Sequence, residues 1–281
     1  MTQVRKILKD CGIRPSKRLG QSFLEDRNII NKITRLSDVC GEDVVVEIGA
    51  GLGIMTELLA AKARKVVAIE VDPRMIAILR ERLNGLSNVE IIERDILSYD
   101  FLSALGDGAT AKLKVVGNVP YNISSQILFH LIGFRQIISS IVLLLQKEVV
   151  NRITASPGTK DYGIPSVIVS MYSVATREMN VPASCFYPPP RVESSLLKIV
   201  MRQRPVLDLE DEYFFSRIVK TAFARRRKTL LNNLRSAGFL CSCEKKLNLF
   251  LKELGIDGNR RGETLSAEEF GRLSNALFRA K

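Results

Sequence analysis

The sequence predicts an α/β protein built on a doubly wound, mostly parallel sheet and followed by a small all-helical domain. Short apolar runs typical of strands buried on both faces alternate with helical patterns through most of the chain. A glycine-rich turn joins the first of these runs to a helix, as at the binding corner of such sheets. From about residue 207 only amphipathic helical patterns remain. We therefore expect one domain over residues 1–206 and a second over 207–281.

Composition and charge narrow the class of protein. The chain has 281 residues, of which 46% are hydrophobic, so a substantial core is available. Its net charge is +12, and a protein this basic is often built to meet a polyanion such as nucleic acid, although a solvated basic surface is the alternative. No apolar run approaches the ~20 residues that cross a bilayer. The N-terminus lacks the apolar core of a signal peptide, so we expect a cytoplasmic protein.

Cysteine and histidine usage argues against metal sites and histidine-based triads. The cysteine count is odd, the spacing is irregular, and no C-x-x-C pair occurs, which favours reduced thiols over disulfides or zinc. His130 is the only histidine and lies between Phe129 and Leu131, so we expect it to pack structurally. The five cysteines are Cys11, Cys40, Cys185, Cys241 and Cys243.

The N-terminal segment is predicted to begin with a short amphipathic helix over Met1–Cys11, ended by Pro15. Lys17 and Arg18 then precede a glycine turn. Such a basic pair suits contact with phosphate, and a solvated arm is equally compatible with these residues. Hydrophobic periodicity predicts a second helix over Asn28–Leu36.

The glycine-rich turn follows the first buried strand. Glu47 precedes Gly49, Gly51 and Gly53, and a helix is predicted over Ile54–Ala63. Glycines permit a tight turn and a close approach of the backbone to a ligand. The third glycine comes one place too early for the G-x-G-x-x-G dinucleotide fingerprint. The pattern is similar to the S-adenosylmethionine loop of class I methyltransferases, with an ordinary glycine-rich turn as the alternative.

Carboxylates end or follow the next two strands. Lys65–Glu70 is the second strand, and Glu70 lies where a carboxylate can accept hydrogen bonds from ribose hydroxyls. Asp72 should cap the next helix. Val89–Ile92 is the third strand, and Asp95 follows it closely. Asp95 can read the exocyclic amine of an adenine ring or cap a helix, and the local sequence does not separate these roles.

The fourth strand, Lys112–Gly117, delivers the tetrapeptide Asn118–Tyr121 at its carboxyl end, where open parallel sheets bind ligands. Ser124 or Ser125 is expected to cap the helix that follows. Further predicted elements are a strand over Ile141–Leu145, helices over Gln146–Thr154 and Ile164–Ser173, and strands over Ala175–Val181 and Ser194–Met201.

The last two strands flank Pro188–Pro190, which fix an extended loop, and their hairpin can close the end of the sheet. An acidic segment then precedes a run of four basic residues, Arg225–Lys228. Amphipathic helices are predicted over Lys245–Leu254 and Ser266–Phe278. These elements make up the expected helical domain.

The order and spacing of these motifs resemble the ribosomal RNA adenine N6-dimethyltransferases, and within them the KsgA type that acts on small-subunit RNA. The resemblance covers essentially the whole chain and implies a class I methyltransferase fold with a Rossmann-like sheet. It also implies S-adenosylmethionine as cofactor and no metal. It is carried by KRLGQSFL, EIGAGLG, AIEVD, GNVPYNIS, LQKEVVNR, FYPPPRVESS and AFARRRKTLLNNL.

The resemblance implies roles for individual residues. The expected cofactor contacts are Ser22, Leu24, Gly49, Gly51, Glu70, Asp95 and Asn118, and the expected catalytic residues are Asn118, Pro120, Tyr121 and Phe186. The side-chain carbonyl of Asn118 and a backbone carbonyl near Pro120 can accept both N6–H bonds of adenine. Tyr121 can stack on the base, and Phe186 can cover its other face. The alternatives are a simple turn for Asn118 and Tyr121 and core packing for Phe186.

The implied reaction places two methyl groups on N6 of two adjacent adenines in a hairpin near the 3′ end of small-subunit ribosomal RNA. The implied partners are this RNA and the immature small subunit, and we expect a monomer. An enzyme for large-subunit RNA, of the antibiotic-resistance type, and an RNA-binding assembly factor with dispensable catalysis stay open as alternatives. Candidate contacts to the RNA backbone are Lys17, Arg18, Arg152, Arg191 and Arg225–Lys228.

Overall fold

The computed structural model describes residues 2–106, 112–238 and 244–280. Cys241 and Cys243 lie outside this part of the chain. The chain divides into two compact units, one formed by Met1–Val150 and Thr176–Met201 and the other by Asn151–Ala175 and Arg202–Lys281. The helical unit therefore also takes in Asn151–Ala175, which the sequence analysis placed in the first domain.

The first unit contains a large sheet, a two-stranded sheet and the helices around them. Its elements are α1 (Gln3–Asp10), β1 (Phe23–Leu24), α2 (Arg27–Leu36), β2 (Val44–Ile48), α3 (Ile54–Ala60), β3 (Lys65–Glu70), α4 (Pro73–Arg82), β4 (Val89–Glu93), η1 (Ile96–Ser98), α5 (Leu102–Leu105), β5 (Leu113–Asn118), η2 (Tyr121–Ile123), α6 (Ser124–Gly133), β6 (Ile138–Gln146), η3 (Ala183–Cys185), β8 (Phe186–Tyr187) and β9 (Ser194–Met201). Helix α7 (Lys147–Ile153) and strand β7 (Ser173–Val181) each contain residues of both units.

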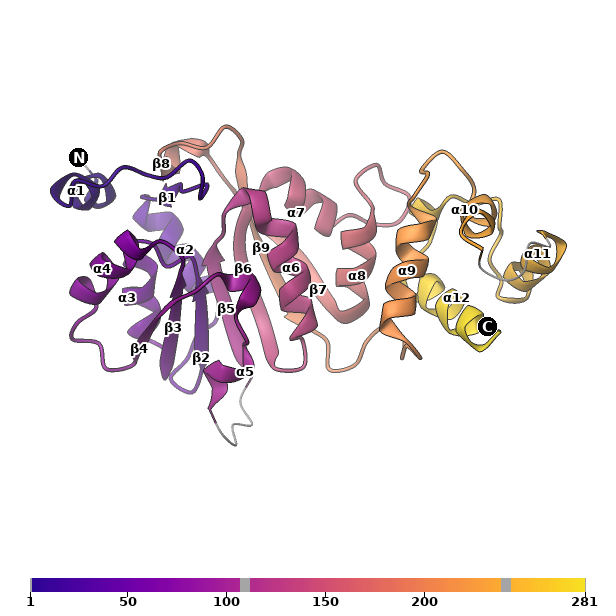
Figure 1. Cartoon of the computed structure of the whole chain (residues 1–281), viewed down its shortest axis with the longest axis horizontal. Coiled ribbons are helices and arrows are strands. Elements are labelled where there is room, and N and C mark those ends of the chain that lie inside the picture. The colour runs from indigo at the N-terminus through magenta and orange to yellow at the C-terminus, as the bar shows by residue number, and fades with distance from the viewer. Residues whose placement is uncertain (1, 107–111, 239–243, 281) are drawn as a thin grey trace. The chain divides into compact units, whose positions relative to one another are not determined.

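The large sheet has the strand order β4-β3-β2-β5-β6-β9-β7 (Figure 1). Strand β2 pairs in parallel with β3 and with β5, and β9 enters antiparallel to β6. All residues of β2 are buried, as expected for a strand covered on both faces. Because the chain runs from β2 towards β3 and β4 on one side, and from β5 towards β6 on the other, right-handed crossovers place α3 and α6 on opposite faces. The predicted doubly wound α/β fold is confirmed.

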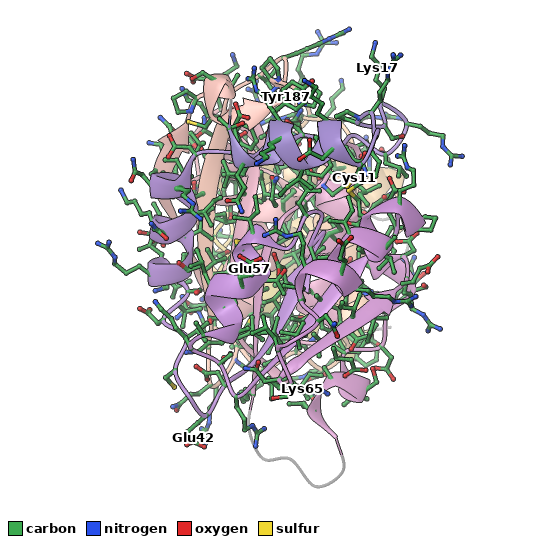
Figure 2. All side chains as sticks on the ribbon, turned by 90° about the vertical axis from the view of Figure 1, so that its left-hand side faces the viewer. Cys11, Lys17, Glu42, Glu57, Lys65 and Tyr187 are labelled. Atoms are coloured by element: carbon green, nitrogen blue, oxygen red, sulfur yellow. The ribbon has the colours of Figure 1, made fainter. Side chains whose placement is uncertain are left out.

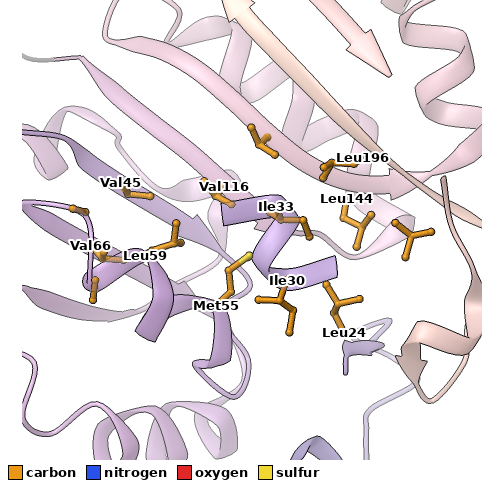
Figure 3. Packing of buried hydrophobic residues seen from close by; sticks show 14 of the residues in the cluster. Leu24, Ile30, Ile33, Val45, Met55, Leu59, Val66, Val116, Leu144 and Leu196 are labelled. Carbon is orange, nitrogen blue, oxygen red and sulfur yellow. The ribbon is translucent and has the colours of Figure 1, made fainter. Parts of the chain in front are cut away.

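On one face of the sheet, two helices pack on the strands and enclose a hydrophobic core. Figure 3 shows Ile30 and Ile33 of α2 and Met55 and Leu59 of α3 beside strand residues such as Val45. Each of these side chains is at most 8% exposed, so the packing is dry. This packing fixes the start of α3, and with it the glycine turn that precedes the helix.

The two-stranded sheet pairs β1 with β8 and was not anticipated from the sequence. Phe23 lies opposite Tyr187 and Leu24 opposite Phe186, and the Glu25 N–H donates to the Cys185 carbonyl at 2.8 Å. Each strand has only two residues, too short for a periodicity signal. Their pairing fastens the N-terminal arm to the proline-rich loop.

Of the helix caps predicted from the sequence, one is confirmed and one is wrong. Asp72 caps α4 as expected, accepting from the Arg74 N–H at 3.0 Å. The prediction that Ser124 or Ser125 caps α6 is wrong. The 3₁₀ turn η2 runs directly into α6, so Ser124 is already the first helical residue, and its hydroxyl donates to the Tyr121 carbonyl at 3.1 Å.

The second unit is helical, with α8 (Ile164–Tyr172), α9 (Glu212–Ala222), α10 (Leu230–Ser236), α11 (Glu244–Glu253), η4 (Gly262–Thr264) and α12 (Ala267–Arg279). Asn233 of α10 donates to the Ala222 carbonyl at 2.9 Å, which ties α10 to the end of α9. Tyr162 is buried beside Phe223, and its hydroxyl donates to the Leu265 carbonyl at 2.8 Å. Within the described residues of either unit, no helix is both long and apolar enough to span a membrane.

Candidate active site

A pocket opens in the first unit at the carboxyl ends of β2, β3, β4 and β5, where the direction of winding reverses. Ile48 of β2 lies opposite Gly117 of β5, so the glycine loop and the Asn118–Tyr121 segment leave the sheet side by side. The site residues predicted from the sequence that line this pocket are Ser22, Gly49, Gly51, Glu70, Asp95, Asn118, Pro120 and Tyr121.

Two predicted site residues lie elsewhere. Leu24 is buried and borders a smaller apolar hollow behind the glycine loop, together with Glu47. Phe186 is 1% exposed and packs in the same hydrophobic cluster as Leu24. In this structure Phe186 therefore occupies the core, and stacking on a base would require its ring to leave that position.

Glu70 holds the glycine loop in place. Its carboxylate accepts the Gly51 N–H at 2.9 Å and the N–H groups of Val71 and Asp72 at 2.8 and 3.0 Å. Burial raises the pKa of Glu70, and the three backbone donors oppose that shift. Gly49 and Gly51 have φ angles of +71° and +55°, which explains why the loop needs glycine there. A carboxylate has about four acceptor sites, so Glu70 retains capacity for a ligand hydroxyl.

Glu47 lies beneath this loop in an apolar setting. Its side chain is 1% exposed, and its Oε2 has no hydrogen-bond partner in the described part of the chain. Burial raises the pKa of Glu47 from an ordinary 4.5 to about 8, and the nearby charge of Glu70 adds to the shift. Glu47 therefore carries a proton at neutral pH. The sequence singled out this residue only as part of a motif and gave no sign of its protonation.

Asp95 fulfils the structural role that the sequence left open and also lines the pocket. Its Oδ1 accepts the Leu97 N–H at 3.0 Å, which caps the turn η1. Val71 and Ile96 add apolar surface to the same wall, and Val71 is 47% exposed. Sequence reasoning missed both, although each directly follows a predicted site residue at a strand end. This wall therefore combines apolar surface with the carboxylate of Asp95.

Asn118 is oriented by the N-terminal arm. Its Nδ2 donates to the backbone carbonyl of Ser22 at 2.9 Å. This bond identifies Oδ1 as the atom left to accept a hydrogen bond inside the pocket. Ser22 is held in turn, because its hydroxyl donates to the Pro188 carbonyl at 2.7 Å. The arm and the proline-rich loop thus set the direction of the Asn118 amide.

Tyr121 presents its ring beside Asn118 from the turn η2. Its hydroxyl forms a hydrogen bond with the hydroxyl of Ser194 in β9. Burial raises the pKa of the Tyr121 phenol, so the ring stays neutral at physiological pH. The pocket wall therefore includes an aromatic side chain and two carbonyl acceptors, Asn118 Oδ1 and the Pro120 backbone, which also accepts the Ile123 N–H at 3.4 Å.

The arm is anchored on the other side of the pocket as well. Gln21 donates to Asp72 Oδ2 at 2.8 Å and accepts from the Ser16 N–H at 2.7 Å. Arg18 and Arg94 line the pocket and are exposed, and no described residue pairs with either guanidinium. Lys17 lies at the edge of the view in Figure 2, consistent with its exposed side chain. Two exposed arginine side chains therefore line this pocket.

His130 and the described cysteines stay outside the pocket. The His130 ring contacts the Tyr99 carbonyl at 3.1 Å and packs on Phe101 and Phe134, which confirms its structural role. Cys11, Cys40 and Cys185 are free thiols. Across residues 2–106, 112–238 and 244–280, no group of three or more potential ligand side chains could hold a metal ion.

Comparison with known proteins gives consistent matches over nearly the full length. The family described as ribosomal RNA adenine dimethylase matches residues 13–278. The chain is 45% identical to a ribosomal RNA small subunit methyltransferase A from Syntrophus aciditrophicus, over 99% of each chain. It is 46% identical to a protein of the same name from Moorella thermoacetica, over 96% of this chain and 95% of that one.

Two solved structures share the fold over most of the chain. A dimethyladenosine transferase from Plasmodium falciparum superposes with a TM-score of 0.78 at 27% identity, covering 89% of this chain and 95% of the other. The 23S rRNA methyltransferase ErmE superposes with a TM-score of 0.70 at 25% identity, covering 91% and 99%. The fold is therefore shared with a dimethyladenosine transferase and with a 23S rRNA methyltransferase.

Proposed function

Because the chain belongs to the ribosomal RNA adenine dimethylase family, we propose that it dimethylates N6 of two adjacent adenines near the 3′ end of small-subunit ribosomal RNA. The target is a hairpin, and the methyl donor is S-adenosylmethionine. The observation that supports the proposal is the Asn118 amide, whose Nδ2 donates to the Ser22 carbonyl and so leaves Oδ1 as the acceptor for a substrate. Relatives named for the small subunit favour that RNA over the large-subunit alternative.

The residues of the pocket fit S-adenosylmethionine. Glu70 can accept the ribose hydroxyls, Asp95 can accept the adenine amine, and Val71 and Ile96 offer apolar surface for the ring. A Cβ on Gly49 would lie 3.2 Å from the Asn118 carbonyl oxygen, so the loop keeps this wall free of side chains. S-adenosylmethionine supplies an electrophilic methyl group when bound. The contacts of Ser22 and Leu24 to its methionine end belong to the same proposal.

The chain's own residues act on the target base by positioning. The N6 lone pair of adenine is delocalised into the ring and is a poor nucleophile. Asn118 Oδ1 and the Pro120 carbonyl accept the two N6–H bonds, which favours a pyramidal nitrogen with its lone pair directed at the methyl donor. The target adenine leaves the stack of RNA bases, and Tyr121 then stacks on it, a contact worth ~1–3 kcal/mol. Phe186 is proposed to cover the opposite face once RNA is bound.

This scheme requires no strong general base. The product nitrogen loses its proton readily after methylation, and burial keeps Tyr121 neutral. The same acceptors serve the second methyl transfer, since one N6–H remains to be bound.

Basic residues outside the pocket, together with Arg18, which lines it, are proposed to hold the RNA backbone. In the second unit, Arg225, Arg227 and Lys228 are exposed, and no described residue pairs with their side chains. Arg226 differs, because its guanidinium donates to Glu263 at 3.1 Å and to the Lys160 and Tyr162 carbonyls at 2.8 and 3.2 Å. The basic run therefore divides into three free cations and one structural arginine. Arg18, Lys17, Arg152 and Arg191 complete the proposed set.

We place this activity in the cytoplasm, on the immature small subunit, with the enzyme acting as a monomer. The free thiols of Cys11, Cys40 and Cys185 suit a reducing compartment. Partly assembled subunits would present the hairpin together with the surrounding RNA that the basic surface binds.

Asn118→Ala tests the chemistry against the alternative of an assembly factor with dispensable catalysis. We expect a loss of methyl transfer of at least about 100-fold, because the only side-chain acceptor for N6 is removed. RNA binding should stay within about twofold, since Asn118 is assigned no contact with the RNA backbone. Nucleoside mass spectrometry of treated immature small subunits measures the product, and filter binding measures affinity. Unchanged methyl transfer contradicts the assigned role of Asn118.

The same assay on wild-type protein tests the product and the substrate. Dimethyladenosine should form on the small subunit, and free large-subunit RNA should stay unmodified. A product that stops at monomethyladenosine with cofactor in excess contradicts dimethylation. Modification of large-subunit RNA alone would select the antibiotic-resistance type of activity instead.

A further inference from the structure

Two hydroxyl groups from segments far apart in the chain meet at the wall of the pocket. The phenol of Tyr121 is in hydrogen-bond contact with the hydroxyl of Ser194, 73 positions further along the chain. Ser194 is the first residue of β9, lies opposite Gln146 of β6, and is completely buried. No described contact links Ser194 to the cofactor-binding loop, so this serine acts on the site only through Tyr121.

Residue Tyr121 is held at its backbone and at its phenol oxygen. Its backbone carbonyl accepts the Ser124 hydroxyl at 3.1 Å, and its phenol oxygen is bound by Ser194. The turn η2 that carries Tyr121 has only three residues and no side-chain cap of its own. Without the Ser194 contact, the side chain could move to another χ1 rotamer, because Tyr121 lines an open pocket.

We propose that Ser194 is a positioning residue for methyl transfer, which fixes the position of the Tyr121 ring on which the target adenine stacks. This inference rests on the proposed function, since it assumes an adenine in the pocket. The bond holds the ring in place before the base enters, so the base meets a ring already in the productive position. Ser194 lies on the antiparallel strand that enters the sheet next to β6, which makes that strand part of the substrate site.

The neighbouring residue provides a matched control within the same strand. Ser195 is also completely buried, but it points to the opposite face of β9, as successive strand residues do. Its hydroxyl donates to Asn180 Oδ1 at 2.7 Å, away from the pocket. Ser194 and Ser195 thus share residue type, strand and burial, and differ in whether their partner lines the site.

The test compares Ser194→Ala with Ser195→Ala. Each variant loses one buried hydrogen bond, so both should lower the melting temperature by similar amounts. Ser194→Ala alone should lower kcat for methyl transfer to small subunits, by about 10- to 100-fold, as expected for a misplaced contact. Its affinity for S-adenosylmethionine, measured by calorimetry, should be unchanged.

Tyr121→Phe removes the other partner of the same hydrogen bond. It provides the test if Ser194→Ala does not fold. It keeps the aromatic face and removes only the phenol, so it should lower kcat to the same extent as Ser194→Ala. The double variant should be no slower than either single variant. Full additivity, or a kcat for Ser194→Ala that matches that of Ser195→Ala, overturns the role of Ser194. Wild-type protein that transfers no methyl group to small subunits refutes the proposed function, and this inference with it.

Discussion

Glu47→Gln should remove a pH dependence of stability that the buried carboxyl imposes. The pKa of Glu47 is about 8 in the folded chain and 4.5 ordinarily, so between these values the folded state holds a proton that the unfolded state has lost. Stability therefore falls as pH rises through this window. Each pH unit costs at most ~1.4 kcal/mol, which gives about 2–3 kcal/mol between pH 5.5 and 7.5. Because the side chain is 1% exposed, little of this is screened by solvent.

The glutamine side chain matches the neutral carboxyl in shape and does not titrate. Urea denaturation of ligand-free wild type and Glu47→Gln across pH 5.5–8.5 measures the difference, and other titrating groups cancel between the two proteins. The free energy of unfolding of the variant, relative to that of wild type, should increase steadily as pH rises. Glu42→Gln provides the control, because Glu42 is exposed at the periphery of the first unit (Figure 2). Parallel pH profiles for wild type and Glu47→Gln would refute a buried, protonated Glu47.

Three further substitutions test a strand contact in the first unit and the basic run in the second. Gly117→Ala would place a Cβ 2.8 Å from the Ile48 carbonyl oxygen, so β2 and β5 must separate. We expect the free energy of unfolding, measured by urea denaturation, to fall by about 2 kcal/mol. An unchanged denaturation midpoint would contradict this close approach. Arg226→Gln should lower stability by about 1 kcal/mol through the lost bonds to Glu263 and two carbonyls, and should leave the salt dependence of RNA binding nearly unchanged. The neighbouring substitution, Arg227→Gln, should have the opposite effects. It should leave the melting temperature unchanged and reduce the slope of log affinity against log salt concentration by about 0.7–0.9. Equal slopes for the two variants would refute the division of the basic run into structural and RNA-binding residues.

The sequence by itself determined the alternation of strands and helices and the positions of most site residues. Apolar runs such as Lys65–Glu70 are local patterns, and their boundaries in the structure agree with those expected. The glycine loop could also be predicted from the sequence, because the positive φ angles of Gly49 and Gly51 restrict the residue type at each position. Parallel strands deliver their carboxyl ends to one edge of a sheet, so Glu70, Asp95 and Asn118 could be placed together without coordinates.

Only the tertiary structure decided how these residues are held and which of them reach the pocket. The contacts that orient Asn118 and Tyr121 come from Ser22 and Ser194, 96 and 73 positions away in the chain. Strand pairs of two residues, such as β1 with β8, carry no periodic signal, and their register depends on packing between remote segments. Burial follows the same logic, since it is the sum of all neighbours in space. That sum places Phe186 in the core and leaves Glu47 protonated beneath the glycine loop.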